Sequence, residues 1–231
     1  MDGGVIRRWV AGAAVLSAIA FLVAVLDAPS RRVSRTADLA WAIPVSVLII
    51  AGAAAMPGPP TPDPDGTLLR AATWVGVILG LGWVIEISVN AALPVPVSQV
   101  QWRDLFDDVV WALVAAGMVL AGAIMARRTR RFAAGAWSGA WAGLVSGLIA
   151  FLASLALDTA LTGLVARDPS ERTEFALRGA AQGFHDVAAY AARQTLFGSL
   201  LHLVFLGVLM GVALGAVGAA VGTSRALSPR A

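Results

Sequence analysis

Two residues that can carry a charge lie inside long apolar stretches of the sequence. Glu86 is followed one helical turn later by Asn90, and His202 lies about a turn inside the last apolar stretch. An acid, an amide and an imidazole at one place could bind a proton or a cation. A charged side chain at the centre of a bilayer costs about 2.5–3.5 kcal/mol, so these residues should face other helices or a water-filled recess. The alternative is that they are polar residues satisfied at the level of the lipid headgroups.

The expected direction of each apolar stretch places further polar residues on the same side of the membrane as Glu86. If successive apolar stretches alternate in direction, Asp158 lies at the end of one that runs outward, and Asp107 and Asp108 lie at the start of one that runs inward. The sequence therefore predicts one polar cluster, made of Glu86, Asn90, Asp158 and His202.

No motif in the sequence specifies a reaction. There is no Walker loop, no nucleotide-binding GxGxxG after a strand, no HExxH and no GxSxG elbow. Ser138 and Ser146 each precede a glycine, as in rhomboid-type intramembrane hydrolases, but serine and glycine also mix wherever membrane helices pack closely. The two histidines are far apart in the chain, and there is no cysteine. We predict no catalytic residue, no metal and no cofactor.

The composition defines the class of protein that carries these residues. Of the 231 residues, 58% are hydrophobic and 13% are charged, and the mean hydropathy is +0.79. The apolar residues form blocks long enough to cross a bilayer, and most blocks lack the polar face of a soluble helix. The sequence predicts an all-α, polytopic membrane bundle that forms one domain over residues 1–231. A soluble all-helical protein is the alternative that this composition disfavours.

Six spans and one surface helix are expected in this domain. The spans cover about residues 9–26, 39–56, 68–93, 109–126, 132–157 and 196–222. A proline-rich connector at 57–66 separates the first two spans from the other four, and Asp107 is a suitable N-cap for the fourth. Asp168, Pro169 and Glu171 have the spacing of a capping box, and an amphipathic pattern follows them. We therefore expect a helix along the membrane surface at about 169–195.

Glycines recur every four residues in the last two spans. Residues four apart share one face of a helix, so each row of glycines forms a smooth groove in which another backbone can lie closely. Such a glycine zipper predicts that the two spans pack tightly in the bilayer. The rows are Gly135, Gly139, Gly143 and Gly147 in the fifth span, and Gly207, Gly211 and Gly215 in the last.

The distribution of arginine predicts the orientation. All 17 basic residues are arginines, and most flank apolar blocks, which is typical of membrane edges rather than of a nucleic-acid-binding surface. Arg7, Arg8 and the cluster at 127–131 lie on the side of both termini, whereas the basic first connector, 31–35, lies on the other. We expect both termini in the cytoplasm. Arginine without lysine indicates a GC-rich coding sequence, and hence a bacterial inner membrane.

Three functions remain open at this stage. The first is a non-enzymatic subunit, scaffold or interaction partner, because the glycine zipper explains packing without a ligand. Its expected partners are the lipid bilayer and either another membrane protein or a second copy of the chain, with no nucleic acid. The second is a small transporter or channel with an outward-facing polar recess around Glu86. The third is an intramembrane enzyme.

Overall fold

The computed structural model describes residues 2–27, 35–60, 62–63, 65–92, 100–179, 181–184 and 186–226. Over these residues the chain is helical and contains no β-strand, which confirms the predicted all-α class. The helices are α1 (Gly3–Asp27), α2 (Arg35–Ala55), α3 (Thr67–Ala92), α4 (Val100–Thr129), α5 (Phe132–Val165), α6 (Pro169–Glu174), α7 (Val187–Leu200) and α8 (Met210–Ala226), with two π-helical segments, η2 (Phe175–Gly179) and η3 (Leu201–Leu209).

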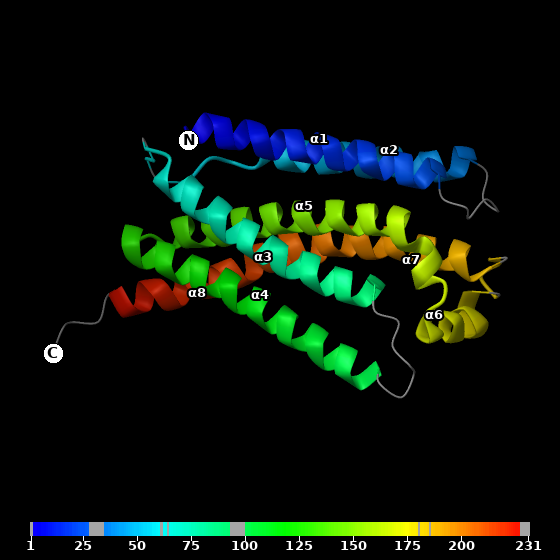
Figure 1. The fold of residues 1–231 in the computed structure, drawn as a ribbon. Coiled ribbons are helices and arrows are strands. Elements are labelled where there is room, and N and C mark those ends of the chain that lie inside the picture. Colours follow the sequence, from blue (N-terminus) through cyan, green and yellow to red (C-terminus); the bar gives the residue numbers. More distant parts are fainter. Residues whose placement is uncertain are drawn as a thin grey trace.

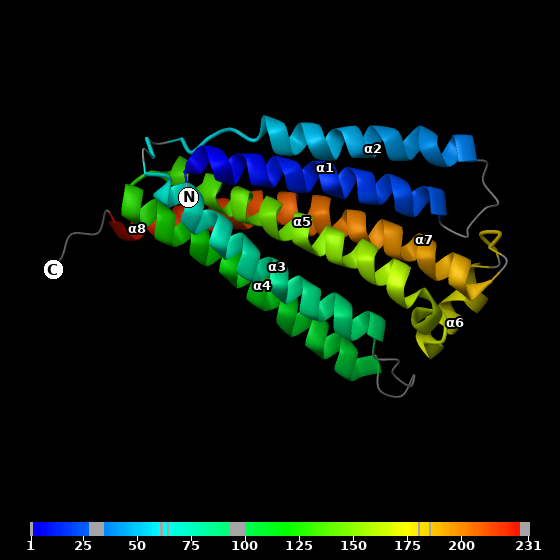
Figure 2. The ribbon, with the colours of Figure 1, turned by 45° about the horizontal axis from the view of Figure 1, so that its top comes forward.

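Five helical stretches are long and apolar enough to cross a membrane: Gly3–Leu26, Thr67–Ala91, Gln101–Thr129, Phe132–Leu157 and Val187–Ser224. The second predicted span lies in α2, whose apolar part, Ala40–Ala55, is shorter than these five. Figure 2 shows α2 running alongside α1. The helices α7, η3 and α8 follow one another without a break, and together they are called the last helix below.

The fifth helix, α5, forms the centre of the bundle. Its most apolar stretch is 72% buried, whereas those of the other four candidate spans are at most 39% buried. Figure 1 shows α1 and α2 on one side of α5 and the last helix, and α3 and α4 on the other. The many glycine, alanine and serine residues of α5 explain this position, because small side chains let neighbouring helices approach.

The glycines of α5 lie directly against the backbone of the last helix. Gly139 faces the main chain of Gly211 and Gly215, and Gly143 faces that of Gly207 and Gly211. A Cβ atom added to Gly211 would lie 2.8 Å from the Cα atom of Gly143, which is closer than side chains tolerate. Only residues without a side chain therefore allow this contact, in which backbone packs on backbone.

A third helix joins this contact. Gly135 of α5 lies against Gly122 of α4 and Ala219 of α8, and Gly218 of α8 faces the carbonyl group of Val119 in α4. The three helices α4, α5 and α8 thus meet around small residues. The four-residue spacing in α5 and α8 gave no indication that α4 takes part.

The two ends of the bundle differ. The start of α1 and the end of α8 lie at one end, called the terminal end here (Figure 1). There the connector after α2 is held by Arg7, whose Nη2 donates to the Met56 carbonyl at 2.7 Å, and by Trp137, whose Nε1 donates to the Pro57 carbonyl at 2.8 Å. At the opposite end, α3 and α4 diverge from α5, and α6 lies beside them (Figures 1 and 2). This opposite end is called the recess end.

The fourth helix begins earlier than the sequence predicted. It starts at Val100 rather than near residue 109, so Asp107 lies within α4 and is not its N-cap. The side chain of Asp107 instead accepts a hydrogen bond from Asn90 of α3 at 3.0 Å. A partner on another helix therefore satisfies the carboxylate that the sequence had assigned to the helix terminus.

The predicted surface helix at 169–195 is not one continuous helix. Its cap is confirmed, because Asp168 precedes α6, accepts a hydrogen bond from the Ser170 N–H and is followed by Pro169. The helical segment ends at Gly179, and the chain turns through Gly183, which has a φ of 88°. Asp186 then caps α7 by accepting from the Ala189 N–H at 2.8 Å. The second half of the predicted surface helix thus belongs to the last helix.

Candidate functional site

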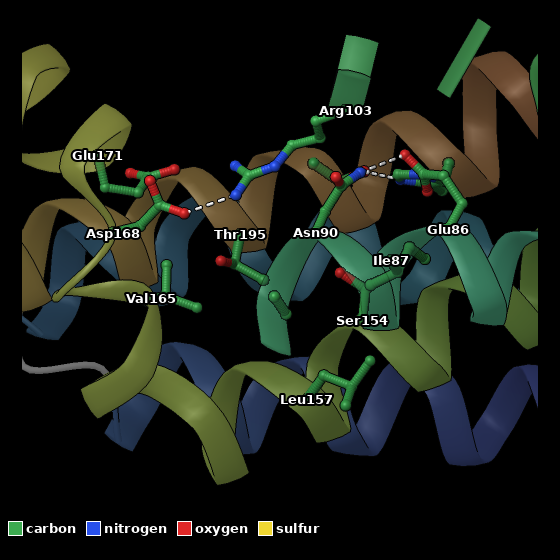
Figure 3. Close-up of a pocket in the computed structure, with 13 residues that line it drawn as sticks. Glu86, Ile87, Asn90, Arg103, Ser154, Leu157, Val165, Asp168, Glu171 and Thr195 are labelled. Atoms are coloured by element: carbon green, nitrogen blue, oxygen red, sulfur yellow. Dashed lines mark hydrogen bonds and ion pairs between the residues drawn. The ribbon is translucent and has the colours of Figure 1, made fainter. Parts of the chain in front are cut away.

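A cavity of about 190 Å³ lies at the recess end, between α3, α4, α5, α6 and the last helix (Figure 3). It is called the recess below. Its polar lining combines three carboxyl groups, one amide, one guanidinium and one imidazole from four different segments. These side chains belong to Glu86, Asn90, Arg103, Asp168, Glu171 and His202.

Glu86 is a buried acid of the recess, with only 6% of the residue exposed. Asn90, one turn further along α3, donates from Nδ2 to Glu86 Oε1 at 2.9 Å and to Asp107 Oδ1 at 3.0 Å. One amide thus bridges carboxylates on two adjacent helices. The second oxygen of Glu86, Oε2, is buried and has no hydrogen-bond partner.

His202 faces this second oxygen. Its Nδ1 lies 2.8 Å from the Gly198 carbonyl oxygen and must donate there, because a carbonyl can only accept. Its Nε2 lies 3.6 Å from Glu86 Oε2, and Trp83 packs edge-on against the ring at a centroid distance of 5.3 Å. A neutral imidazole with its proton on Nδ1 presents a lone pair at Nε2. Neutral His202 and ionised Glu86 would therefore face each other with two acceptors, unless a further proton or a donor lies between them.

Arg103 and Asp168 close the recess on the side of α6. Arg103 Nη2 donates to Asp168 Oδ2 at 2.7 Å, and the two side chains are 14% and 5% exposed. Ser170 donates its N–H and its hydroxyl to the other oxygen, Oδ1. Burial raises the pKa of Asp168, but the hydrogen bonds from Arg103 and Ser170 outweigh this, and its pKa lies below the usual range. Asp168 is therefore ionised at neutral pH and holds the start of α6 against α4.

Glu171 lies one turn into α6 and points to the same recess (Figure 3). In a complete capping box its carboxyl would bond the Asp168 N–H, but that N–H donates to the Val165 carbonyl at 3.0 Å. Its Oε2 is buried without a hydrogen-bond partner. Burial raises the pKa of Glu171, and the negative charges of Glu174 and Asp168 raise it further, while Arg103 lowers it. The carboxyl group of Glu171 is therefore not used by the helix cap and is available to interact within the recess.

A second, larger hollow of about 910 Å³ lies between α2, α5 and the last helix. Its lining is apolar apart from Gln194, whose amide donates to the Tyr190 hydroxyl at 2.7 Å. Among the described residues that line this hollow, no buried side-chain polar group lacks a hydrogen-bond partner. The recess, and not this apolar hollow, is therefore the candidate site.

Three residues of the predicted polar cluster, Glu86, Asn90 and His202, lie together in the recess. The fourth, Asp158, belongs to α5, and its side chain lies outside the described residues. The glycines of the two rows lie apart from the recess, where α5 meets the last helix. Both serines that precede a glycine are buried in α5, and Ser146 donates to the Gly143 carbonyl at 3.0 Å.

The sequence did not assign Arg103, Asp168 or Glu171 to this site. Asp168 and Glu171 were recognised only as residues of a helix start, and Arg103 was not predicted to belong to any site. Arg103 and Asp168 are separated by 65 residues, so no local pattern could pair them. The one available signal was an acid-rich capping box shortly after the fifth span, whose end was expected on the same side as Glu86.

Within the part of the chain that the structure describes, no three His, Asp or Glu side chains form a group that could hold a metal ion. The fold and the site define a class: a polytopic helical membrane protein with a buried polar recess at one end of the helical bundle. No known protein family, curated protein or solved structure matches the chain. Its function must be inferred from the chemistry of the recess.

Proposed function

We propose that this protein binds a small polar solute or ion in the recess and works as a small transporter or channel. The observation that carries the proposal is a set of buried polar atoms without hydrogen-bond partners that surround one cavity. Four of them are hydrogen-bond acceptors: Glu86 Oε2, Asn90 Oδ1, Glu171 Oε2 and His202 Nε2.

Burying these atoms without hydrogen-bond partners costs free energy, and this cost favours a recess that contains a polar occupant. A buried polar group without a partner costs about 1–3 kcal/mol, and native proteins keep very few of them. The four atoms come from three separate segments, α3, α6 and η3, and all belong to residues that line the same space. At about 30 Å³ per water, a cavity of about 190 Å³ has room for about six waters or for a solute of similar size. Each of these four atoms has less than 1 Å² of exposed surface, so a polar occupant satisfies them after small movements of the lining side chains.

The pair of Glu86 and His202 adds a link to protons. A further proton on either residue, or a donor group placed between them, satisfies the same two atoms, Glu86 Oε2 and His202 Nε2. Binding of a donor ligand and binding of a proton therefore compete at this pair. Such competition is what a proton-coupled carrier requires.

The first function considered from the sequence, a scaffold or subunit, rested on the glycine zipper. Gly139 and Gly143 are covered by the last helix of the same chain, so their close packing needs no second protein. A membrane-protein partner or a second copy of the chain therefore stays a prediction without this support. The third function, an intramembrane enzyme, gains no support from the buried Ser138 and Ser146.

We also propose that both termini lie in the cytoplasm of a bacterium, with the recess on the outer side of its inner membrane. The cluster of arginines at 127–131 and Arg7 and Arg8 near the terminal end support this orientation. Because the chain lacks cysteine, single cysteines report the side directly. Gln101→Cys should react with a membrane-impermeant thiol reagent added to intact cells, and Ser224→Cys should not. The reverse pattern would overturn the orientation.

The proposed function is tested by asking whether the recess contains water. Thr195 lines it, whereas Ser46 is 4% exposed and bonded to the Ala18 carbonyl of α1. In protein reconstituted into lipid nanodiscs, Thr195→Cys should react with a small water-soluble thiol reagent many times faster than Ser46→Cys. Equal, slow reaction of the two cysteines would mean a closed recess and would remove the basis of the proposal.

A further inference from the structure

We infer that the ligand of the recess carries a primary ammonium group on a short apolar chain. The inference rests on the proposed function, since it names the class of ligand for the same site. Its basis is the balance of charge, of hydrogen-bonding groups and of space among the described lining residues.

The charges of the lining favour a cation. Three carboxyl groups line the recess, and the guanidinium of Arg103 pairs with one of them, Asp168. Glu86 and Glu171 remain, with His202 as the only other residue of the lining that can be positive. A cation close to both carboxyl groups is favourable in this setting of low dielectric, and an anion is not.

Four buried atoms of the lining without a hydrogen-bond partner are acceptors, so a ligand that satisfies these four must donate hydrogen bonds. A carboxylate oxygen and an amide oxygen can only accept, and Nε2 of a neutral His202 with its proton on Nδ1 can only accept. Glu86 Oε2 belongs to a residue that is more than nine-tenths buried, and it points to the recess. An ammonium group has three N–H donors and one positive charge, as the lysine side chain does. It therefore matches both requirements with one functional group.

The rest of the lining fits a short apolar chain. Ile87, Leu157 and Val165 line the recess alongside the polar groups. An alkyl chain of a few carbons packs against these side chains, while its ammonium end bonds to Glu86 and Asn90. The same apolar residues offer nothing to a hydrated metal ion, and the described residues contain no three-ligand metal group.

An ammonium group can reach the recess from two sources. One is a free amine from the aqueous side, and the other is the headgroup of phosphatidylethanolamine, because the recess lies near one membrane face. The chemistry is shared, so lipid composition distinguishes the sources. Nanodiscs of phosphatidylglycerol alone lack the headgroup, and nanodiscs with added phosphatidylethanolamine supply it.

The experiment measures protection of Thr195→Cys by small solutes in phosphatidylglycerol nanodiscs. Propylammonium chloride should slow the reaction with the thiol reagent at least several-fold. Sodium acetate, 1-propanol and sodium chloride at the same concentration should leave the rate unchanged. Protection by propylammonium should be lost when Glu86→Gln and Glu171→Gln are added to Thr195→Cys. The matched control is Glu174→Gln, which removes an acid from the same helix, α6, outside the recess lining and should keep the protection.

The outcomes separate the two proposals. If Thr195→Cys does not react at all, the recess is closed and the proposed function fails. If it reacts but acetate, propanol or sodium chloride protects as well as propylammonium does, the recess binds solutes and the ammonium assignment is wrong. Protection that survives Glu86→Gln together with Glu171→Gln also contradicts the assignment. A slower reaction in phosphatidylethanolamine nanodiscs without added amine supports the assignment and identifies the lipid headgroup as the source.

Discussion

The contact between α5 and the last helix consists of glycine backbone in one part and of polar side chains in another. Toward the terminal end, Gly143 and Gly211 bring the two backbones together with no side chain between them. Toward the recess end, the hydroxyls of Ser154 and Ser199 lie 2.7 Å apart, and His202, between Ser199 and Gly207 along the last helix, borders the recess. The same pair of helices is therefore closed at one level and hollow at another.

This difference shows how a small membrane protein can be rigid and still keep a site. The glycine contact uses van der Waals packing and no polar group, and it has no space for any other arrangement. In the proposed function, the polar groups near the recess end bind the ligand.

The largest expected effect comes from closing the glycine contact with a side chain. Gly143→Leu should lower the free energy of unfolding by about 3 kcal/mol, the upper part of the range for overpacking, because the added Cβ meets the Gly207 carbonyl. Thermal unfolding in mild detergent measures this. The matched control is Gly52→Leu in α2, where a Cβ meets nothing within 4 Å, and it should be close to neutral. Similar losses in both variants would show that the contact has no special role.

A smaller effect on stability is expected from a substitution at the recess end. Asp168→Ala should cost about 2 kcal/mol, because it removes a helix cap worth about 1 kcal/mol and a hydrogen bond to charged Arg103 of similar size. Hydrogen exchange should increase in α6 and remain unchanged in the core of α5. The control is Glu174→Ala, which removes an exposed ion pair with Arg178 at 3.6 Å and should change stability by less than about 0.5 kcal/mol. An equal effect of the two substitutions would argue against a structural role for Asp168.

Glu86→Gln should change stability still less, by under about 1 kcal/mol in either direction. The glutamine oxygen can still accept from Asn90, and its amide can donate to His202 Nε2, so no new unpaired group is created. Chemical unfolding of the purified protein measures the change. A loss above about 2 kcal/mol would mean that the charge of Glu86 holds the bundle together, and the division into a structural region and a binding region would then fail.

The smallest effect is the pH dependence of the recess end. The pKa of Asp168 is lowered in the folded state, so its contribution to stability is complete above its unfolded pKa of about 3.9 and is lost as the pH falls below that value. The pKa of Glu171 is raised, so stability increases as the pH falls from its folded pKa toward about 4.3. In unfolding curves recorded between about pH 6 and pH 3, Asp168→Asn should remove the loss, and Glu171→Gln should remove the gain. Unchanged curves for both variants would contradict these assignments.

The class of fold could be predicted from the sequence because it depends on local composition. Apolar blocks of span length and glycines at a four-residue spacing are visible in any short window. Glu86 and Asn90 share a helical face for the same reason, since they are four residues apart. The position of His202 near Glu86 was expected from counting residues along a span.

The parts that could not be predicted depend on distant residues or on competing local signals. The pairing of Arg103 with Asp168 depends on how α6 folds back toward α4, which no local pattern determines. The break between α6 and α7 had signals in Gly179, Gly183 and Asp186, but the amphipathic pattern across them was given more weight. The early start of α4 was missed because Asp107 looked like a cap, whereas its actual partner, Asn90, lies on another helix.

The π-helical segment η3 connects the part of the last helix that borders the recess to the part that contacts the glycines of α5. It fixes how far one part is rotated about the helix axis relative to the other. His202 is its second residue, and the glycines Gly207, Gly211 and Gly215 begin within it and continue into α8. A π-turn closes its hydrogen bond one residue later than an α-turn does. Each residue of an α-helix turns by about 100°, so loss of one residue from η3 would turn the imidazole away from Glu86 while the glycines kept their contact with α5. The direction in which His202 points is therefore encoded in the number of residues in this segment, and a single-residue deletion there would abolish the recess without altering any residue that lines it.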